Sequence, residues 1–156
     1  MDEYLPRIQA MLPGLVIQST RLITVGAHNN AVMVQSPDGN WVFRFAKNDA
    51  GRAALGRELC VLDSLKGRSP VDVPVPLIRE PDAIAYRMLA GEHLTYWALA
   101  ALDEPARQRI AGQLGTFLRE LHNTPPGLPL PDNTGMDLTG MFRGIQDQVQ
   151  QELYPC

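Results

Sequence analysis

Two oppositely charged residues lie in apolar surroundings within the segment WVFRFAKNDAGRAALGRE, residues 41–58. Arg44 lies between two phenylalanines, in a short run of bulky apolar residues typical of a β-strand. Glu58 falls inside the apolar arc of the helix predicted to follow, at about 100° of rotation per residue. A charge in such surroundings is costly unless it is paired. The pattern therefore predicts an ion pair between a strand and a helix.

A second interpretation stays open from these residues alone. Side chains alternate along a strand, so Val42 and Arg44 share one face while the three aromatic residues share the other. If the Arg44 face is solvated and Glu58 lies at the edge of the apolar arc, each charge reaches water without a partner.

The elements that would position the pair follow one another in a simple order. The predicted strands are 15–25, 31–35, 41–45 and 83–89. The predicted helices are 2–11, 49–66 with Asp49 as its cap, 103–122 with Asp103 as its cap, and 138–149. Residues 73–80 are expected to form an extended linker. Strands followed by helices predict an α+β fold, with the sheet in one lobe and the helices in another.

Composition excludes several classes of protein. Apolar residues make up 45% and charged residues 20%, which indicates a globular and not a disordered chain. The net charge of −3 has both signs interspersed, so no basic face for nucleic acid is expected. No apolar run approaches the ~20 residues of a membrane span, and the N-terminus lacks a signal-peptide pattern. Two cysteines make no disulfide framework or metal spacing, which favours a cytoplasmic location.

The order of motifs resembles the aminoglycoside/macrolide phosphotransferase family, which has a protein-kinase-like fold. The matching stretches are Gly26 with Asn30, VFRFAK at 42–47, Arg57-Glu58 followed by VLDSL, VPVP at 73–76, AYRMLAGE at 85–92 and QLGTFLRELH at 113–122. The resemblance implies a nucleotide lobe over residues 1–91, with its hinge at about 86–91. Residues 92–156 would begin the helical C-terminal lobe.

The resemblance also implies roles by position. Gly26 to Asn30 would form the loop over the phosphates of ATP or GTP. Arg44 would grip those phosphates where most kinases have lysine, and Glu58 would hold Arg44 in place. Val42 would press on the base. The hinge that bonds the base edge would comprise Arg87, Met88, Leu89 and Ala90.

Three features qualify this resemblance. The loop at 26–30 has one glycine where the kinase pattern GxGxxG has three, which predicts looser phosphate enclosure. Arg44 keeps the charge of a lysine but is bulkier and forks its donors, so the exchange is not neutral. Lys47 lies on the opposite strand face and is expected to be a solvated lysine instead of a phosphate ligand.

A kinase-like enzyme also needs an aspartate beside the substrate hydroxyl and metal ligands. In this family the aspartate lies in a His-Gly-Asp motif, yet none of His28, His93 and His122 is followed by aspartate two residues later. No catalytic or metal-binding residue is therefore predicted, and Mg²⁺ is expected only in a full-length enzyme. The chain is expected to be truncated before the catalytic loop. It would be the nucleotide-binding half of a small-molecule kinase of the antibiotic-resistance type, inactive by itself and a weak binder of ATP or GTP.

Two other functions stay open, a non-catalytic kinase-like interaction module and a nucleotide sensor. Either would dock through an apolar stripe on the predicted helix at 138–149, which also predicts self-association. The stripe comprises Leu138, Met141, Phe142, Ile145 and Val149. A small-molecule acceptor is expected only if the chain is completed. Neither that acceptor nor the choice between ATP and GTP can be read from these residues.

Overall fold

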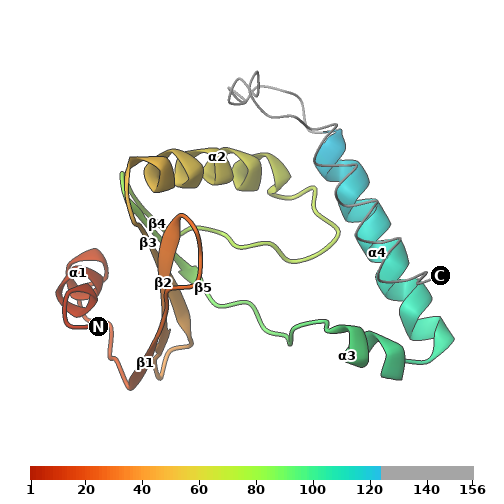
Figure 1. Ribbon diagram of the computed structural model, residues 1–156, viewed down its shortest axis with the longest axis horizontal. Helices are drawn as coiled ribbons and strands as arrows, with labels where there is room; N and C mark the ends of the chain where they lie inside the picture. Colours follow the sequence, from red (N-terminus) through yellow and green to blue (C-terminus); the bar gives the residue numbers. More distant parts are fainter. Residues whose placement is uncertain (124–156) are drawn as a thin grey trace, which may run out of the picture.

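The computed structural model describes residues 1–123, in which five strands form one sheet and four helices surround or follow it (Figure 1). The helices are α1 (Tyr4–Met11), α2 (Asp49–Leu65), α3 (Tyr96–Ala101) and α4 (Glu104–His122). The strands are β1 (Ser19–Ile23), β2 (Asn29–Gln35), β3 (Trp41–Ala46), β4 (Ile78–Glu80) and β5 (Ala83–Arg87).

The sheet has the strand order β1-β2-β3-β5-β4, and every neighbouring pair is antiparallel. β3 lies at its centre, where Arg44 is opposite Ala31 of β2 and Ile84 of β5. The strands all lie in one antiparallel sheet within residues 19–87, and α3 and α4 follow it, so the predicted α+β fold is confirmed.

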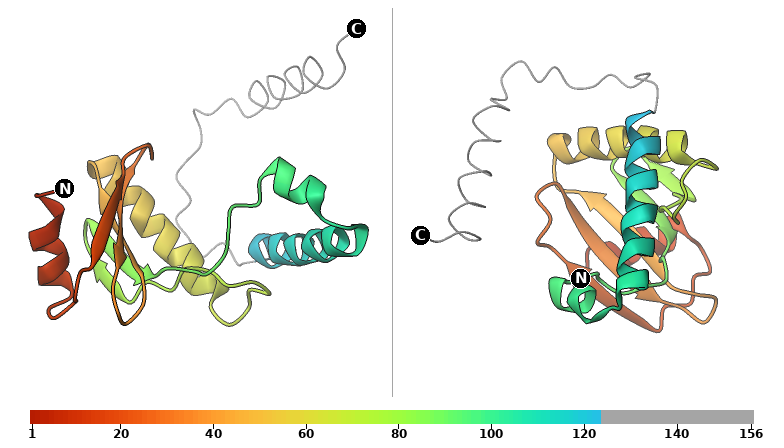
Figure 2. Two further views of the ribbon diagram at one scale, coloured as in Figure 1. Left: turned by 90° about the horizontal axis from the view of Figure 1, so that it is seen from below. Right: turned by 90° about the vertical axis from the view of Figure 1, so that its right-hand side faces the viewer.

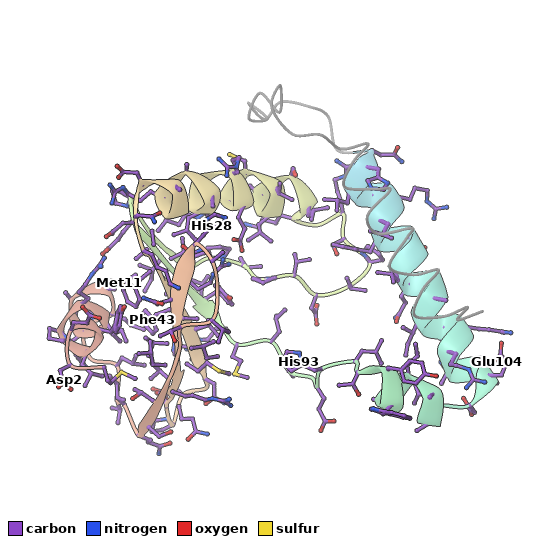
Figure 3. All side chains as sticks on the ribbon, in the orientation of Figure 1. Asp2, Met11, His28, Phe43, His93 and Glu104 are labelled. Atoms are coloured by element: carbon purple, nitrogen blue, oxygen red, sulfur yellow. The ribbon has the colours of Figure 1, made fainter. Side chains whose placement is uncertain are left out.

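One face of the sheet carries the main core, under α1 (Figure 2, left). Trp41, Phe43 and Phe45 of β3 are buried there, as the alternation along the strand predicts. Figure 3 shows Phe43 on the side of the sheet where α1 lies. Each such aromatic side chain contributes about 1.5–3 kcal/mol when it is removed from water. The other face of β3 is therefore left for Val42 and Arg44.

Helix α1 is held on this core by aromatic and charged contacts. The ring of Tyr4 lies 5.0 Å from that of Phe45. The guanidinium of Arg7 lies 4.8 Å from the centre of the Phe45 ring and donates a hydrogen bond to Asp82 at 2.8 Å.

Helix α2 covers the opposite face, where it contacts β3 and β5 (Figure 2). Leu55 and Leu65 are its buried apolar residues. The predicted cap was wrong by one residue, because the side chain of Asn48, and not Asp49, accepts a hydrogen bond from the Gly51 amide at 3.0 Å. Asparagine before the first helical residue is an equally good cap.

Helices α3 and α4 lie away from the sheet, beyond the extended residues 88–95 (Figure 1). The predicted cap of α4 is confirmed, since the Asp103 carboxylate accepts from the Ala106 amide at 2.8 Å. Two short elements, β4 and α3, were not predicted. The predicted helix at 138–149 and its apolar stripe lie outside the described residues. Within residues 1–123, no helix combines the length and apolar character that crossing a membrane requires.

Candidate functional site

Arg44 and Glu58 form an ion pair that joins β3 to α2. Nη1 of Arg44 donates to Oε1 of Glu58, and the two side chains are 22% and 33% exposed. The pair is thus half-buried between the strand and the helix. The predicted pairing is confirmed, and the interpretation with two separately solvated charges is wrong.

Asn29, at the start of β2, is a second neighbour of Arg44. In the amide orientation that satisfies both of its groups, the side-chain oxygen accepts from Nη2 of Arg44 at 3.0 Å. The amide nitrogen then donates to the carbonyl oxygen of His28 at 3.1 Å. The guanidinium is therefore oriented from two sides, by Glu58 of α2 and by the first residue of β2.

Tyr86 of β5 belongs to the same cluster, on the strand face that carries Val42 and Arg44. Burial raises the pKa of the Tyr86 hydroxyl above its ordinary value, and the nearby Glu58 carboxylate acts in the same direction. The charge of Arg44 and a hydrogen bond from it oppose this rise in pKa. Tyr86 is therefore a neutral group beside the ion pair at physiological pH.

A hollow of about 350 Å³ lies beside the pair on this face of the sheet. It is lined by the end of β1, the loop after it, the start of β2 and one residue of β3: Ile23, Val25, Gly26, Ala27, His28, Asn29, Ala31 and Arg44. In Figure 3 the loop residue His28 lies near α2, at the end of the sheet that this helix covers. Arg44 is the one cation among these lining residues.

A second hollow, of about 340 Å³, lies toward the other end of the same strands. Its lining residues are Ser19, Thr20, Arg21, Met33, Val34, Gln35, Asn40 and Met88. Val42 lies between the two hollows, since it is opposite Met33 while Arg44 is opposite Ala31. The face thus offers a cation at one end, an apolar residue in the middle and the segment after β5 at the other end.

The loop before β2 makes a tight turn at Gly26. A Cβ atom added to Gly26 would come within 2.9 Å of the carbonyl oxygen of Asn29, closer than real Cβ contacts. Lys47 is exposed, as expected, but its ammonium group is not free. It donates to the carbonyl oxygens of Thr24 and Gly26 at 2.8 and 2.6 Å.

Asn30, the other residue assigned to this loop, is not brought to Arg44. Its side chain follows the α1 face, where Nδ2 donates to the hydroxyl of Tyr4 at 2.7 Å. Its neighbour Asn29 is the residue that contacts the cation.

The residues assigned to the hinge are Arg87, the last residue of β5, and the three residues that follow it. The guanidinium of Arg87 stacks 4.1 Å from the Trp41 ring and donates to the carbonyl oxygen of Asp38, so its side chain holds the β2–β3 turn. The amide of Met88 donates to the carbonyl oxygen of Asn40 at 2.9 Å. Leu89 and Ala90 are exposed, and neither amide has a backbone acceptor within residues 1–123.

This arrangement is suited to binding an anion next to an apolar group. A guanidinium held by a carboxylate on one side keeps further N–H donors for a ligand. Among residues 1–123, no three His, Cys, Asp or Glu side chains gather in a way that could hold a metal ion.

No sequence pattern predicts the contacts that Asn29, Lys47 and Tyr86 make at this site. The one sequence signal of a close approach between α2 and the loop was Gly51, in the first turn of α2. An isolated glycine in a helix often marks a close packing contact. Its backbone lies against the loop carbonyl of His28.

Comparisons with known proteins agree on one family. The model of the phosphotransferase enzyme family matches residues 19–153. Among solved structures, the chain is similar to the GDP and kanamycin complex of APH(2″)-IIIa, with 26% identity and a TM-score of 0.71. That match covers 99% of this chain and 53% of the other.

Two further structures extend the comparison. The GDP complex of a mutant aminoglycoside 2′-phosphotransferase IIIa is 27% identical, with a TM-score of 0.70, over 98% of this chain and 52% of that one. Apo macrolide 2′-phosphotransferase MphH from Brachybacterium faecium is 25% identical, with a TM-score of 0.52, over 58% and 31%. No curated protein sequence matches. The chain spans about half the length of the two aminoglycoside enzymes.

Proposed function

The chain belongs to the phosphotransferase enzyme family, and we propose that residues 1–91 are the nucleotide-binding lobe and hinge of a small-molecule kinase. The observation that carries this proposal is the geometry of Arg44, whose guanidinium is paired with Glu58 and lines a hollow beside the loop at Gly26. The proposed ligand is ATP or GTP, in line with the GDP bound in two similar structures.

The phosphates would bind at the Arg44 end of the face. A guanidinium has five N–H donors, of which Glu58 and Asn29 take one each and the Tyr86 hydroxyl takes a further one. The remaining donors are available to phosphate oxygens, for which arginine is a good partner. Glu58 would keep the cation in place and neutralise it before the nucleotide arrives. Asn30 would contribute through its backbone at most, since its side chain bonds to Tyr4.

The base would bind at the other end, against Val42. The polar contacts to its edge would come from the backbone of Leu89 and Ala90, because the Met88 amide already donates to Asn40. Met88 would then pack on the base with its side chain, which lines the second hollow. A nucleotide would thus extend along the face from the segment after β5 to the loop.

The reaction proposed for the whole protein is phosphoryl transfer to a hydroxyl of an aminoglycoside, a macrolide or a related metabolite. Residues 92–156 would begin the second lobe. The 156 residues contain no His-Gly-Asp motif, so the groups that activate the acceptor and hold Mg²⁺ would belong to a further part of such an enzyme.

Calorimetric titration of the 156-residue chain with ATP and GTP tests the proposal. We expect weak binding that depends little on magnesium. Arg44→Met should lower the affinity at least tenfold, because it removes a charge-assisted contact with the phosphates. Arg109→Met removes the same charge from exposed α4 and should leave the affinity unchanged. Absence of binding, or equal affinity in Arg44→Met, would contradict the proposal. Tight binding that requires magnesium would contradict the assignment of the metal ligands to another part of the enzyme.

One observation favours a second candidate, a non-catalytic docking module. Tyr96 and Trp97 of α3 are 74% and 79% exposed, which is unusual for large aromatic residues. Sedimentation of the chain over a range of concentrations would reveal self-association. A monomer at all concentrations that binds nucleotide would leave the first candidate as the better one.

A further inference from the structure

Lys47 makes the most extensive polar contact with the loop before β2. Its ammonium group donates to the carbonyl oxygens of Thr24 and Gly26, at 2.8 and 2.6 Å. Its backbone amide donates to the carbonyl oxygen of His28 at 2.9 Å. Three alternate carbonyl groups of the loop are thus bound by one residue. The two bonds from the ammonium group are charge-assisted, which makes them about twice as strong as neutral ones.

These bonds fix which way the loop peptides face. In a trans peptide the N–H group points opposite to the C=O group of the same unit. Since the carbonyls of Thr24 and Gly26 point at the ammonium group, the amides of Val25 and Ala27 point away from it. Neither amide has a backbone acceptor within residues 1–123.

Val25 and Ala27 also line the hollow that contains Arg44. Successive backbone N–H groups that converge on one space form a concave site for anions. Two residues with unpaired amides therefore line the same hollow as Arg44, and the bonds from Lys47 fix the direction of those amides.

We propose that Lys47 is a positioning residue, which orients the loop so that the amides of Val25 and Ala27 can bind phosphate oxygens. The proposal rests on the proposed function, because it takes the hollow as the phosphate site. Lys47 follows β3 on the face opposite Arg44, so it acts from behind the loop and does not touch the ligand. It gives a loop with a single glycine the fixed backbone that anion binding requires.

The test uses the 156-residue chain with Lys47→Met, Lys47→Arg and Lys66→Met. Lys66 is the only other lysine of the sequence and is exposed, so its replacement matches the change in charge. Two quantities are measured: the protection from hydrogen exchange that a saturating triphosphate gives the amides of Val25 and Ala27, and the affinities for the triphosphate and for its nucleoside. The nucleoside lacks phosphates and therefore reports on the fold and on the base site.

Lys47→Met should remove most of this protection and lower the affinity for ATP or GTP about tenfold, the scale of one or two lost backbone hydrogen bonds. Its affinity for adenosine or guanosine should stay the same. Lys47→Arg should retain part of the amide protection and part of the triphosphate affinity. Lys66→Met should leave both quantities unchanged.

An unchanged ratio of triphosphate to nucleoside affinity in Lys47→Met overturns the role of Lys47, as does unchanged protection of the two amides by a saturating triphosphate. An equal loss of both affinities also overturns it, because that pattern indicates general destabilisation. If the unmodified chain binds neither triphosphate, the proposed function itself fails. If the unmodified chain binds a triphosphate and Lys47→Met binds it equally well, only the role of Lys47 fails.

Discussion

The backbone of Gly51, in the first turn of α2, lies directly against the carbonyl oxygen of His28 in the loop before β2. A Cβ atom added to Gly51 would overlap this oxygen and come within 3.3 Å of the Cβ of Ala46. Glycine thus sets how closely α2 approaches the sheet. Because Glu58 is on the same helix, the contact also sets the distance of its carboxylate from Arg44.

Gly51→Ala should destabilise the protein by about 1–3 kcal/mol, the scale of overpacking at a tight contact. Gly56 lies in the same helix with open space around its Cα, so Gly56→Ala should stabilise by about 0.5–1 kcal/mol through helix propensity. Urea denaturation midpoints provide the measurement. A stabilising effect of Gly51→Ala would contradict this prediction, because it would mean that the loop at His28 shifts to accommodate the methyl group at little cost.

Glu58→Ala should destabilise by about 1–3 kcal/mol, between the 0–1 kcal/mol of exposed pairs and the 3–5 kcal/mol of buried ones. The intermediate scale follows from the partial exposure of both partners. Glu92→Ala is the control, since Glu92 is exposed in the extended segment before α3. Equal urea midpoints for the two variants would mean that solvent screens the pair.

Tyr86 should make stability fall at alkaline pH. Because the folded protein raises the pKa of this hydroxyl, the fold favours its protonated form. That contribution is complete below the ordinary tyrosine pKa of about 10 and is lost as the pH rises toward the raised value. Tyr86→Phe should therefore show a shallower decline in unfolding free energy above about pH 10.

Denaturation midpoints between neutral and alkaline pH measure this decline. Tyr96→Phe removes an exposed tyrosine hydroxyl and serves as the control. Parallel curves for the unmodified chain and Tyr86→Phe would contradict the assignment.

The 156-residue chain should not transfer phosphate to any acceptor. Phosphoryl transfer needs metal ions and a residue that orients the attacking hydroxyl, and none of the three histidines begins the motif that supplies such a residue. Binding ground and transition states equally does not raise turnover. A sensitive assay of ATP and GTP consumption with aminoglycosides and macrolides is the check. Turnover that disappears in Arg44→Met would refute this prediction.

The parts of the site fixed by local periodicity could be predicted from the sequence. Alternation along β3 and the turn of α2 are short-range properties, so they placed Arg44 and Glu58 on facing surfaces. Asn29 and Asn30 show the limit, because a shift of one residue moves a side chain to the other face. The strand was expected to begin at 31, whereas β2 begins at Asn29.

The remaining contacts depend on where distant backbone lies. The carbonyl partners of Lys47 have no signature in residue type, since every residue carries a carbonyl group. β4 is only three residues long and is defined by its pairing with β5, so its own sequence resembled a linker.

The strand order of the sheet has a consequence for the way the molecule folds. β1, β2 and β3 are joined by short connections, so their pairing needs little loop closure. Pairing of β3 with β5 requires closure of a much longer loop, residues 47–82, which includes α2. Long-range contacts of this kind form slowly. The contacts on the sheet face that carries Arg44 should therefore form late in folding, after the transition state. Glu58→Ala should then speed unfolding much more than it slows folding.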